Sequence, residues 1–444
     1  MSIIEDVSRS KWIALTAFLA VNFLQIIFVS LLTLDESTLW IIGMDPSLTN
    51  PLVSVVLFVS ILLIQLVLIY MTSFSMLKGE DMIQLHPPLK KEVDLKCIYS
   101  KADLISWTLD LAKKSEVTVT KIFVIKSPFP NAFTFSLPFL GSVVVIHSNL
   151  LDLLSPQEVQ AIIAHEIGHI KSRDSIISIF SRMPSYFVDI IYLYIYVRLG
   201  LGIANSLLVS FDAIAAGARI LVFVGFFILS RVVMWIGQII VQKASRDAEF
   251  LSDHHAAQMV NFEAMINALI RLGQRVEAVS SLIEEIRWLE SLNPERMNPI
   301  NDKELKMMIL SYPLDSIDEK NAREKAPWVF LSTRLVNMRS VYGVDLTDDQ
   351  ILNAITPAVK NLLETRKKAR PDTEEKESPI VDWRNVDKDG DRRITDEEMQ
   401  ALIKLLRDNP TKFMFRNEAS KNILTVGHPD FRRRILFLAD VFEK

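Results

Sequence analysis

Two long stretches without a single charged residue constrain this chain more than any other feature. Residues 12–34 and 51–77 are apolar and uncharged throughout. Each exceeds the roughly 20 residues that a helix needs to cross the hydrocarbon core of a bilayer. The first stretch is long for a signal-peptide core, and no small-residue cleavage site follows it. Both are therefore predicted to be retained transmembrane helices; a cleaved signal or buried core helices are the alternative.

Two further apolar regions carry charges. Residues 175–211 contain Arg182, Asp189 and Arg198, and residues 220–242 contain Arg231 at their midpoint. An unpaired Arg at the bilayer centre costs about 2.5–3.5 kcal/mol, so such charges normally face a partner or a wet cavity. We predict that both regions span the membrane and that Asp189 pairs with Arg231. The alternatives are that these side chains line a water-filled vestibule or snorkel, or that the regions do not span.

Charge and composition limit the remaining possibilities. Of 444 residues 50% are hydrophobic, which excludes a disordered chain, and the net charge of −4 gives no sign of a nucleic-acid partner. A single cysteine excludes a disulfide scaffold and a Cys-rich zinc module. Lys and Arg follow the second span, precede the third and follow the fourth, whereas residues 35–50 have neither. The positive-inside rule therefore predicts a multi-pass protein of the cell (plasma or inner) membrane with both termini cytoplasmic.

The segments outside the spans show helical and strand patterns. The first of them is polar at its start and is predicted to be helical there, with an amphipathic helix at 102–114 and strands at 117–125 and 141–147. The expected order is a cytoplasmic segment at 78–174, a helical segment at 243–290, a helical insertion and linker at 291–379, an acidic segment at 380–410 and a C-terminal segment at 411–444.

The chemistry of the first segment lies on one helix. Ser155 and Glu158 form a capping box, with Pro156 at the first helical position. His165 and His169 are spaced i, i+4, so both imidazoles project from one face, about one turn apart, where they can bind one metal ion. Glu166 lies beside them and can take a proton from an attacking water.

A catalytic zinc needs a third protein ligand and leaves a fourth position for water. Glu249 and Asp253, just past the fourth span, are also spaced i, i+4. One of the two can ligate the metal while the other accepts a hydrogen bond from a ligand histidine. His254 and His255 are rival ligands, and the spacing alone does not choose among them.

These residues carry a resemblance to a known family. The motifs His165-Glu166-Ile167-Gly168-His169 and Glu249-Phe250-Leu251-Ser252-Asp253, together with the order span, span, metal helix, span, span, ligand helix, resemble the HtpX branch of a membrane metallopeptidase family. That family also contains the CAAX prenyl proteases. The resemblance covers about residues 1–275 and a short C-terminal piece. It implies zinc ligands at His165, His169 and Glu249, a base at Glu166 and a supporting carboxylate at Asp253.

Two weaker parts of the resemblance concern substrate and transition state. Asn131, Ala132 and Phe133 after Pro130 resemble the edge strand against which an extended substrate adds as a strand; a plain turn is the alternative. His428-Pro429, followed by Arg434, resembles the late His-Pro motif of the family and implies a transition-state donor at His428 with a supporting Arg434. Here Asp430 replaces the usual second proline, and a long segment precedes the motif.

The tail holds a second candidate metal site. Asp387, Asp389, Asp391 and Glu398 occupy positions one, three, five and twelve of an EF-hand calcium loop. The sixth position is Arg392 in place of glycine, and a left-handed Arg costs about 1–2 kcal/mol. The loop is predicted to bind calcium weakly; a relict turn is the alternative.

The sequence therefore predicts a mainly α integral membrane protein with four transmembrane helices, a cytoplasmic α+β zincin-type metalloprotease domain and a helical C-terminal tail. The expected function is that of a membrane-bound zinc-dependent endopeptidase at the cytoplasmic face, and the family resemblance implies that it cleaves membrane or misfolded proteins in quality control. The expected partners are protein or peptide substrates and the lipid bilayer, with no nucleic acid, and the cofactors are zinc and, in the tail, calcium. The alternatives are a CAAX-type processing protease and a non-catalytic membrane scaffold with a structural zinc.

Overall fold

The chain is described from a computed structural model, which is mostly helical with one small sheet. The described residues are 3–32, 51–78, 82–88, 97–127, 129–137, 141–291, 300, 302–311, 319–342, 347–369, 380–391, 393–419 and 428–442.

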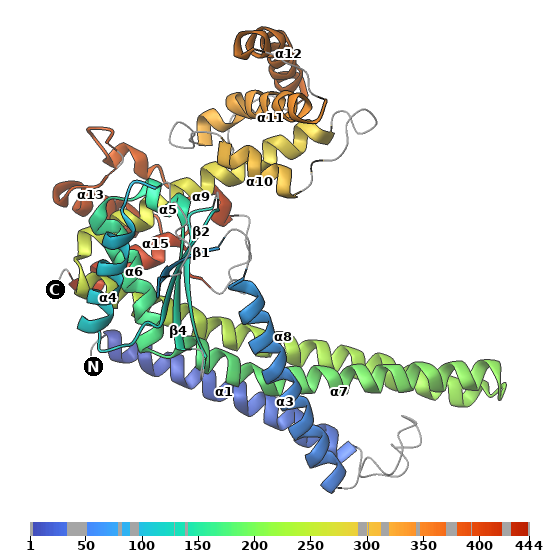
Figure 1. Ribbon diagram of the computed structural model, residues 1–444. Helices are drawn as coiled ribbons and strands as arrows, with labels where there is room; N and C mark the ends of the chain where they lie inside the picture. The colour runs from blue at the N-terminus through green and yellow to red at the C-terminus, as the bar shows by residue number, and fades with distance from the viewer. Residues whose placement is uncertain are drawn as a thin grey trace.

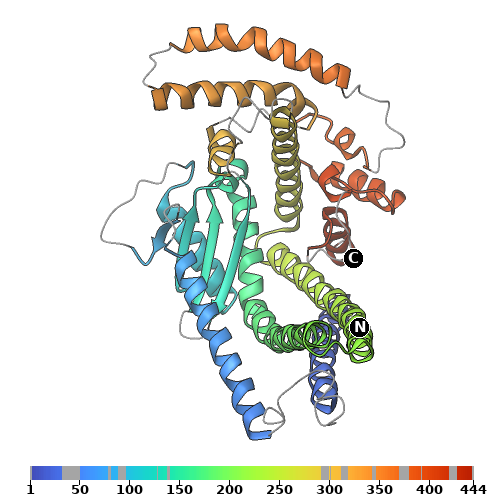
Figure 2. The same ribbon diagram turned by 90° about the vertical axis from the view of Figure 1, so that its right-hand side faces the viewer.

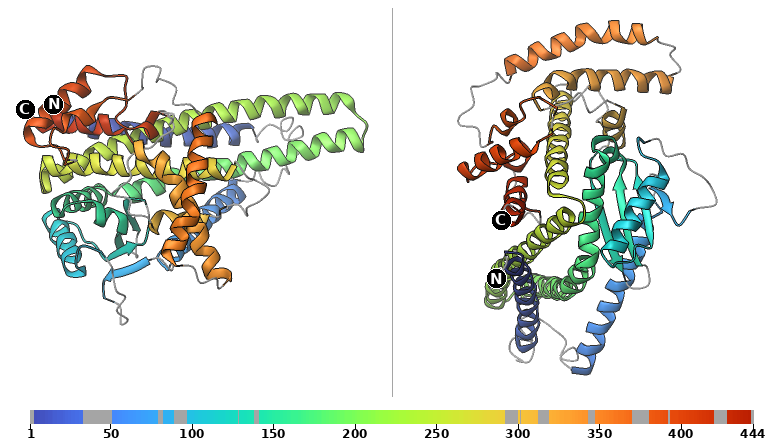
Figure 3. Two further views of the ribbon diagram at one scale, coloured as in Figure 1. Left: turned by 90° about the horizontal axis from the view of Figure 1, so that it is seen from above. Right: turned by 90° about the vertical axis from the view of Figure 1, so that its left-hand side faces the viewer.

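Four long apolar helices extend from one side of a domain that contains the sheet (Figure 1). They are α1 (Ile3–Leu32), α3 (Pro51–Met76), α7 (Asp174–Leu208) and α8 (Ala213–Met259). Helices α7 and α8 form a hairpin that projects from the domain, and α1 packs along both (Figure 3). Large apolar side chains on the hairpin face outward; Leu221, for example, is 77% exposed. Such a surface is stable in a bilayer but not in water.

Length and hydropathy make two stretches of the described chain able to cross a membrane, Val188–Leu208 and Ala213–Met259. They coincide with the third and fourth predicted spans. The first and second predicted spans coincide with α1 and α3, and their membrane insertion stays a prediction. Helix α8 runs without interruption from the apolar region to Met259, so the expected helical segment with the metal ligand begins within the same helix as the fourth predicted span.

The predicted pair of Asp189 and Arg231 forms no direct ion pair in the described part of the chain, although the charge of Arg231 acts on Asp189. Arg231 is exposed, and its guanidinium carbon lies 5.2 Å from the centroid of the Phe227 ring. Asp189 instead lines a polar cavity of about 340 Å³ among α1, α7 and α8, together with Arg182. This arrangement corresponds to the alternative of a polar vestibule.

The sheet has four strands in the order β1-β2-β4-β3. They are β1 (Met82–His86), β2 (Lys121–Ile125), β3 (Ala132–Leu137) and β4 (Gly141–His147). Strands β2 and β4 pair in parallel, and the outer pairs are antiparallel. The β-branched run Val143–Ile146 is fully buried, as expected for a central strand. β1 lies where the sequence predicted helix; alternating Ile83 and Leu85 are buried there, and that period-2 pattern is short.

Helix α6 (Pro156–Lys171) lies between the sheet and α8. It follows α5 (Ser148–Leu153), and its other neighbours are α4 (Lys101–Lys114) and α9 (Phe262–Ser291). Ile163 and Ile167 of α6 join Met265 and Leu269 of α9 in the main apolar core. At Gly168 the backbones of α6 and α8 approach so closely that an added Cβ would lie 3.1 Å from the Ser252 Cα.

The remaining helices form two groups. The predicted insertion contains α10 (Asp302–Ser311), α11 (Glu319–Tyr342) and α12 (Asp348–Ala369), which gather at the far end of α9, away from α1 and α3 (Figure 2). A buried bidentate ion pair between Arg366 and Glu285 ties α12 to α9. The tail contains η3 (Trp383–Val386), α13 (Asp396–Asp408), α14 (Arg416–Ala419) and α15 (Phe431–Phe442). Helix α15 packs on α8 and α9, which brings the end of the chain back to α6.

The close approach at Gly168 yields a stability prediction. Gly168→Ala should lower the free energy of unfolding by about 1–3 kcal/mol, because the new methyl meets backbone that cannot move aside. This loss should exceed the about 1 kcal/mol that Ala gains over Gly in a helix interior. In the control Gly225→Ala, the added Cβ meets no atom within 4 Å, so stability should hold or rise. A thermal melt in detergent that placed Gly168→Ala at or above the parent would contradict the packing argument.

Candidate metal centre

The predicted capping box is confirmed at the start of α6. Glu158 accepts the Ser155 backbone N–H at 2.7 Å, the Ser155 side chain caps the helix in return, and Pro156 occupies the first turn. The capping box thereby satisfies two backbone N–H groups at the N-terminus of the helix. With its start defined, the helix places His165 and His169 on one face, one turn apart.

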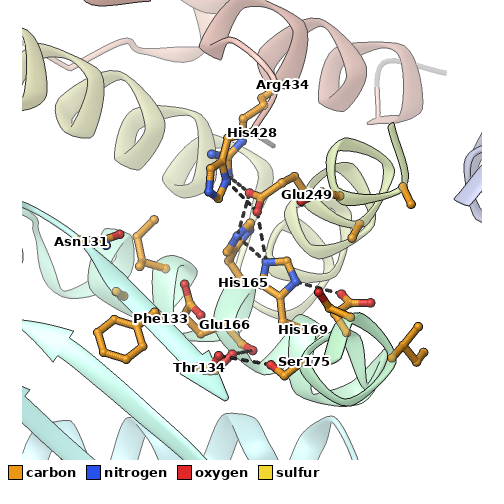
Figure 4. Close-up of a pocket in the computed structure, with 18 of the residues that line it drawn as sticks. Asn131, Phe133, Thr134, His165, Glu166, His169, Ser175, Glu249, His428 and Arg434 are labelled. Carbon is orange, nitrogen blue, oxygen red and sulfur yellow. Dashed lines mark hydrogen bonds and ion pairs between the residues drawn. The ribbon is translucent and has the colours of Figure 1, made fainter. Parts of the chain in front are cut away.

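Three side chains converge beside this face. The His165 Nε2 and His169 Nε2 atoms lie 3.2 Å apart. Glu249, from α8, places one carboxylate oxygen 3.5 Å from the His165 Nε2 and the other 3.6 Å from the His169 Nε2. All three ligand atoms lie within 4.8 Å of one another, close enough to hold one metal ion (Figure 4).

The outward nitrogens of both histidines face carboxylates. The His165 Nδ1 lies 2.8 Å from an oxygen of Asp253, and the His169 Nδ1 lies 2.9 Å from Asp174. A carboxylate beside Nδ1 favours the tautomer that carries its proton there, which leaves the Nε2 lone pair for a metal. Arg434 binds both oxygens of Asp253, at 2.7 and 2.6 Å. Asp253 thus lies within ion-pair distance of His165, and its expected supporting role stays a prediction.

The electrostatics of the centre favour a cation between the histidines. Burial would lower the pKa of the His165 imidazole, but hydrogen bonds to Asp253 and Glu249 outweigh it and raise the pKa to about 10. Burial would raise the pKa of Glu249, yet hydrogen bonds from His165 and His428 hold it well below its usual range. The carboxylates that favour a proton on His165 would equally favour a metal cation in its place.

The charge balance of the centre favours a bound cation. Four carboxylates and three cations lie at the histidines and along the cavity, so with neutral imidazoles the net charge is −1: Glu166, Glu249, Asp253 and Asp174 against Lys11, Arg182 and Arg434. A buried excess of negative charge is costly unless it is compensated. Two imidazoles and one carboxylate are also the donor set of catalytic zinc sites, which keep one position open.

The centre forms the wall of a cavity of about 370 Å³. Glu166 is buried and also lines the cavity, on the side of β3 (Figure 4). Asn131, Ala132 and Phe133, expected to contact substrate, lie along the same cavity. β3 is the last strand of the sheet, so in the described chain only its β4 side is paired, and the strand also packs against α6 and α7. The Thr134 hydroxyl donates to the Glu166 backbone oxygen at 3.3 Å, which holds strand and metal helix together.

The structure also brings the late His-Pro motif to the centre. The His428 Nδ1 lies 2.9 Å from Glu249, and Arg434 approaches the same carboxylate at 3.7 Å. The hydrogen bond to Glu249 raises the pKa of His428. The His428 side chain is 73% exposed, so it stands at the opening of the cavity rather than inside it. The long segment that precedes the His-Pro motif therefore does not keep His428 away from the metal centre.

The rival ligands point away from the centre. The His255 Nε2 lies 2.9 Å from the Ser115 hydroxyl of α4, and the His254 ring packs against Phe442 with centroids 5.5 Å apart. Because His254 and His255 follow Asp253 directly, the rotation of α8 that aims Asp253 at His165 turns them elsewhere.

Two residues of the centre were missed by sequence reasoning, Asp174 and Lys11. Asp174 begins α7, five residues after His169, and an acid so soon after the histidine pair was an available signal. Lys11 stands immediately before the first apolar stretch and pairs with Asp174 from 163 residues away. Nothing in the local sequence indicates that contact.

The acidic loop of the tail is a separate feature. Asp387, Asp389 and Asp391 place three carboxylate oxygens within 4.8 Å of one another. Glu398 is engaged as a cap: its two oxygens accept the backbone N–H groups of Lys388 and Thr395, at 2.8 and 3.0 Å. The left-handed residue is Gly390, with φ +73°, and Arg392 lies outside the described residues.

Comparison with known proteins agrees with this geometry. A model of peptidase family M48 matches residues 99–365, which is more than half of the chain and includes α6 and Glu249. The chain is 26% identical over 236 residues to a protease HtpX homolog of Methylacidiphilum infernorum, covering 50% of this chain and 72% of that protein. It is 34% identical over 133 residues to protease HtpX homolog 1 of Saccharolobus solfataricus, covering 29% and 42%.

A third relative is the protease HtpX of Shewanella halifaxensis, 28% identical over 168 residues and covering 37% of this chain and 57% of that protein. The chain thus spans less than two thirds of the second and third of these relatives. The matched regions nevertheless share one family, and the chain belongs to peptidase family M48 as an HtpX-like metallopeptidase.

Proposed function

We propose that this chain is an integral membrane zinc endopeptidase that cleaves membrane or misfolded proteins at the cytoplasmic face. The observation that carries the proposal is the convergence of the His165, His169 and Glu249 ligand atoms within 4.8 Å, beside an edge strand that lines the same cavity. These three side chains would hold zinc. Zinc bound there would polarise the scissile carbonyl and activate the attacking water.

The residues of the chain supply the remaining parts of the reaction. Glu166 accepts the proton of the attacking water and passes it to the leaving amine. An extended peptide lies along β3, beside Asn131, Ala132 and Phe133, and adds to the sheet through its main chain. His428 at the opening donates a hydrogen bond to the developing oxyanion, and Arg434 keeps Asp253, and through it His165, in place.

Two features support a membrane-protein substrate. The catalytic cavity is lined by Lys11 and Leu15 of α1 and by Ser178 and Arg182 of α7, where the apolar helices join the domain. Arg182 also lines the polar cavity among α1, α7 and α8. An extended substrate backbone within the membrane is tolerated only where protein or water forms hydrogen bonds with its polar groups. The polar side chains of this second cavity can form such hydrogen bonds. The Lys and Arg bias of the sequence supports a cytoplasmic position for the domain.

The first test concerns Glu166. Glu166→Gln should keep the zinc content of the detergent-purified protein and lose casein cleavage by about 10²–10⁴-fold, because the base is removed while the ligands remain. Glu263→Gln, an exposed position on α9, is the control and should cleave like the parent. Parent-rate cleavage by Glu166→Gln would reject the enzymatic mechanism, and retained zinc without cleavage in the parent would favour a structural metal.

The third ligand provides the second test. Glu249→Ala should weaken zinc binding by more than the about 10–100-fold that loss of a supporting partner costs. His254→Ala and His255→Ala should keep parent affinity, since both rings point away from the centre. A competition titration with a fluorescent chelator measures all three. Zinc loss in either histidine variant, with zinc kept in Glu249→Ala, would move the ligand assignment.

A second function, weak calcium binding, is proposed for the loop from Asp387 to Glu398. The observation that favours it is the group of three clustered aspartates, an oxygen donor set that suits calcium. We expect a dissociation constant of about 10⁻⁴–10⁻³ M, lost in Asp389→Asn and tightened in Arg392→Gly. Calorimetry on the full chain measures this. No heat at several millimolar calcium in both the parent and Arg392→Gly would make the loop a turn without a ligand.

A further inference from the structure

The two histidines of the metal centre are supported in the same way. His165 meets Asp253, and Asp253 is bound by Arg434, which comes from α15 near the end of the chain. His169 meets Asp174, and Asp174 is bound by Lys11 from α1 near its beginning. Each histidine therefore has a carboxylate on its Nδ1 and a cation on that carboxylate.

The contacts on the His169 side are buried. The side chains of Lys11 and Asp174 are only 5% and 14% exposed, and both line the catalytic cavity. The Ser252 hydroxyl of α8 also lies 3.1 Å from the His169 Nδ1, so it is the other polar group at that nitrogen. Removing one partner of a buried ion pair leaves an uncompensated charge. Lys11 and Asp174 are therefore stable in this buried position because each compensates the charge of the other.

Local structure holds both partners in position. Arg173, between the end of α6 and the start of α7, has φ +53°, a left-handed conformation that is rare for a residue with a side chain. This turn swings Asp174 back towards His169, five residues earlier. On the other side, Ala14 and Leu15 of α1 pack against Ala244 of α8, one turn after Lys11. The left-handed backbone at Arg173 is of the strained kind that is concentrated at functional sites.

We propose that Asp174 and Lys11 are positioning residues of the metal centre, which is complete only when α1 is docked against α7 and α8. Asp174 fixes the ring of His169 through its Nδ1 proton, and Lys11 fixes Asp174. The inference rests on the proposed zinc site and adds to it: the first apolar helix contributes to metal affinity as well as anchoring the chain.

Zinc affinity of the full-length protein in detergent tests the proposal, by competition with a fluorescent chelator. Asp174→Asn should raise the zinc dissociation constant by about 10–100-fold, the usual effect of removing a carboxylate from a ligand histidine. Lys11→Met should raise it by a smaller factor, about 3–10-fold, since it acts one contact further away. The double variant should be no weaker than Asp174→Asn alone, because Lys11 acts through Asp174.

Controls separate positioning from folding. Lys11→Arg should restore the affinity, and Arg9→Met, an exposed cation on the same helix, should not change it. The cobalt-substituted protein gives a readout that a merely structural role would not move: the absorption bands should shift in Asp174→Asn and stay unchanged in Arg9→Met. All affinities are measured on the monodisperse folded fraction.

The outcomes distinguish a failure of the role assigned to Lys11 from a failure of the proposed zinc site. Parent zinc affinity in Lys11→Met, or a double variant whose loss is the product of the two single losses, overturns the role of Lys11 while zinc-dependent cleavage by the parent still stands. A parent protein that binds no zinc overturns the inference and the proposed function together.

Discussion

Four buried or half-buried carboxylates lie around two histidines, and compensating that charge is the constraint on which the arrangement of the helices depends. Glu249 and Asp253 lie on α8, Glu166 on α6 and Asp174 at the start of α7. A buried carboxylate without a partner is unstable, so each must meet a cation, an imidazole or a metal. The two cations that pair directly with these carboxylates are Lys11 of α1 and Arg434 of α15. The first and last described helices are thereby drawn to the same point in the domain.

Helix α8 connects this centre with the apolar part of the molecule. Its 47 residues begin in the apolar hairpin with α7 and end beyond Asp253. Because a helix is stiff over this length, the position of Glu249 relative to α6 is set partly by how α8 packs on α1 and α7. The close contact at Gly168 removes the remaining freedom, since the backbones of α6 and α8 touch there. A change in the packing of α8 on α1 and α7 would therefore move Glu249 relative to the two histidines.

Local patterns predicted local structure well. The capping box, the helix with the i, i+4 histidines and the buried strand at 141–147 appear as expected, because each depends on neighbours within a few residues. The expectation failed where the signal was short or non-local: β1 spans five residues and pairs with a strand about 40 residues later. Asp189 and Arg231 form no direct ion pair in the described chain, because position along two long helices does not settle which helix faces meet.

The sequence by itself determined which residues could bind metal, since spacing within one helix turn places His165 and His169 side by side whatever surrounds them. It could not choose among Glu249, Asp253, His254 and His255, because the choice depends on the rotation of α8 against α6. Only the tertiary structure decided that Glu249 faces the histidines, that His428 reaches it from 179 positions later, and that Lys11 meets Asp174. The physical reason is that packing sets helix rotation and depth, and packing is a property of the whole chain.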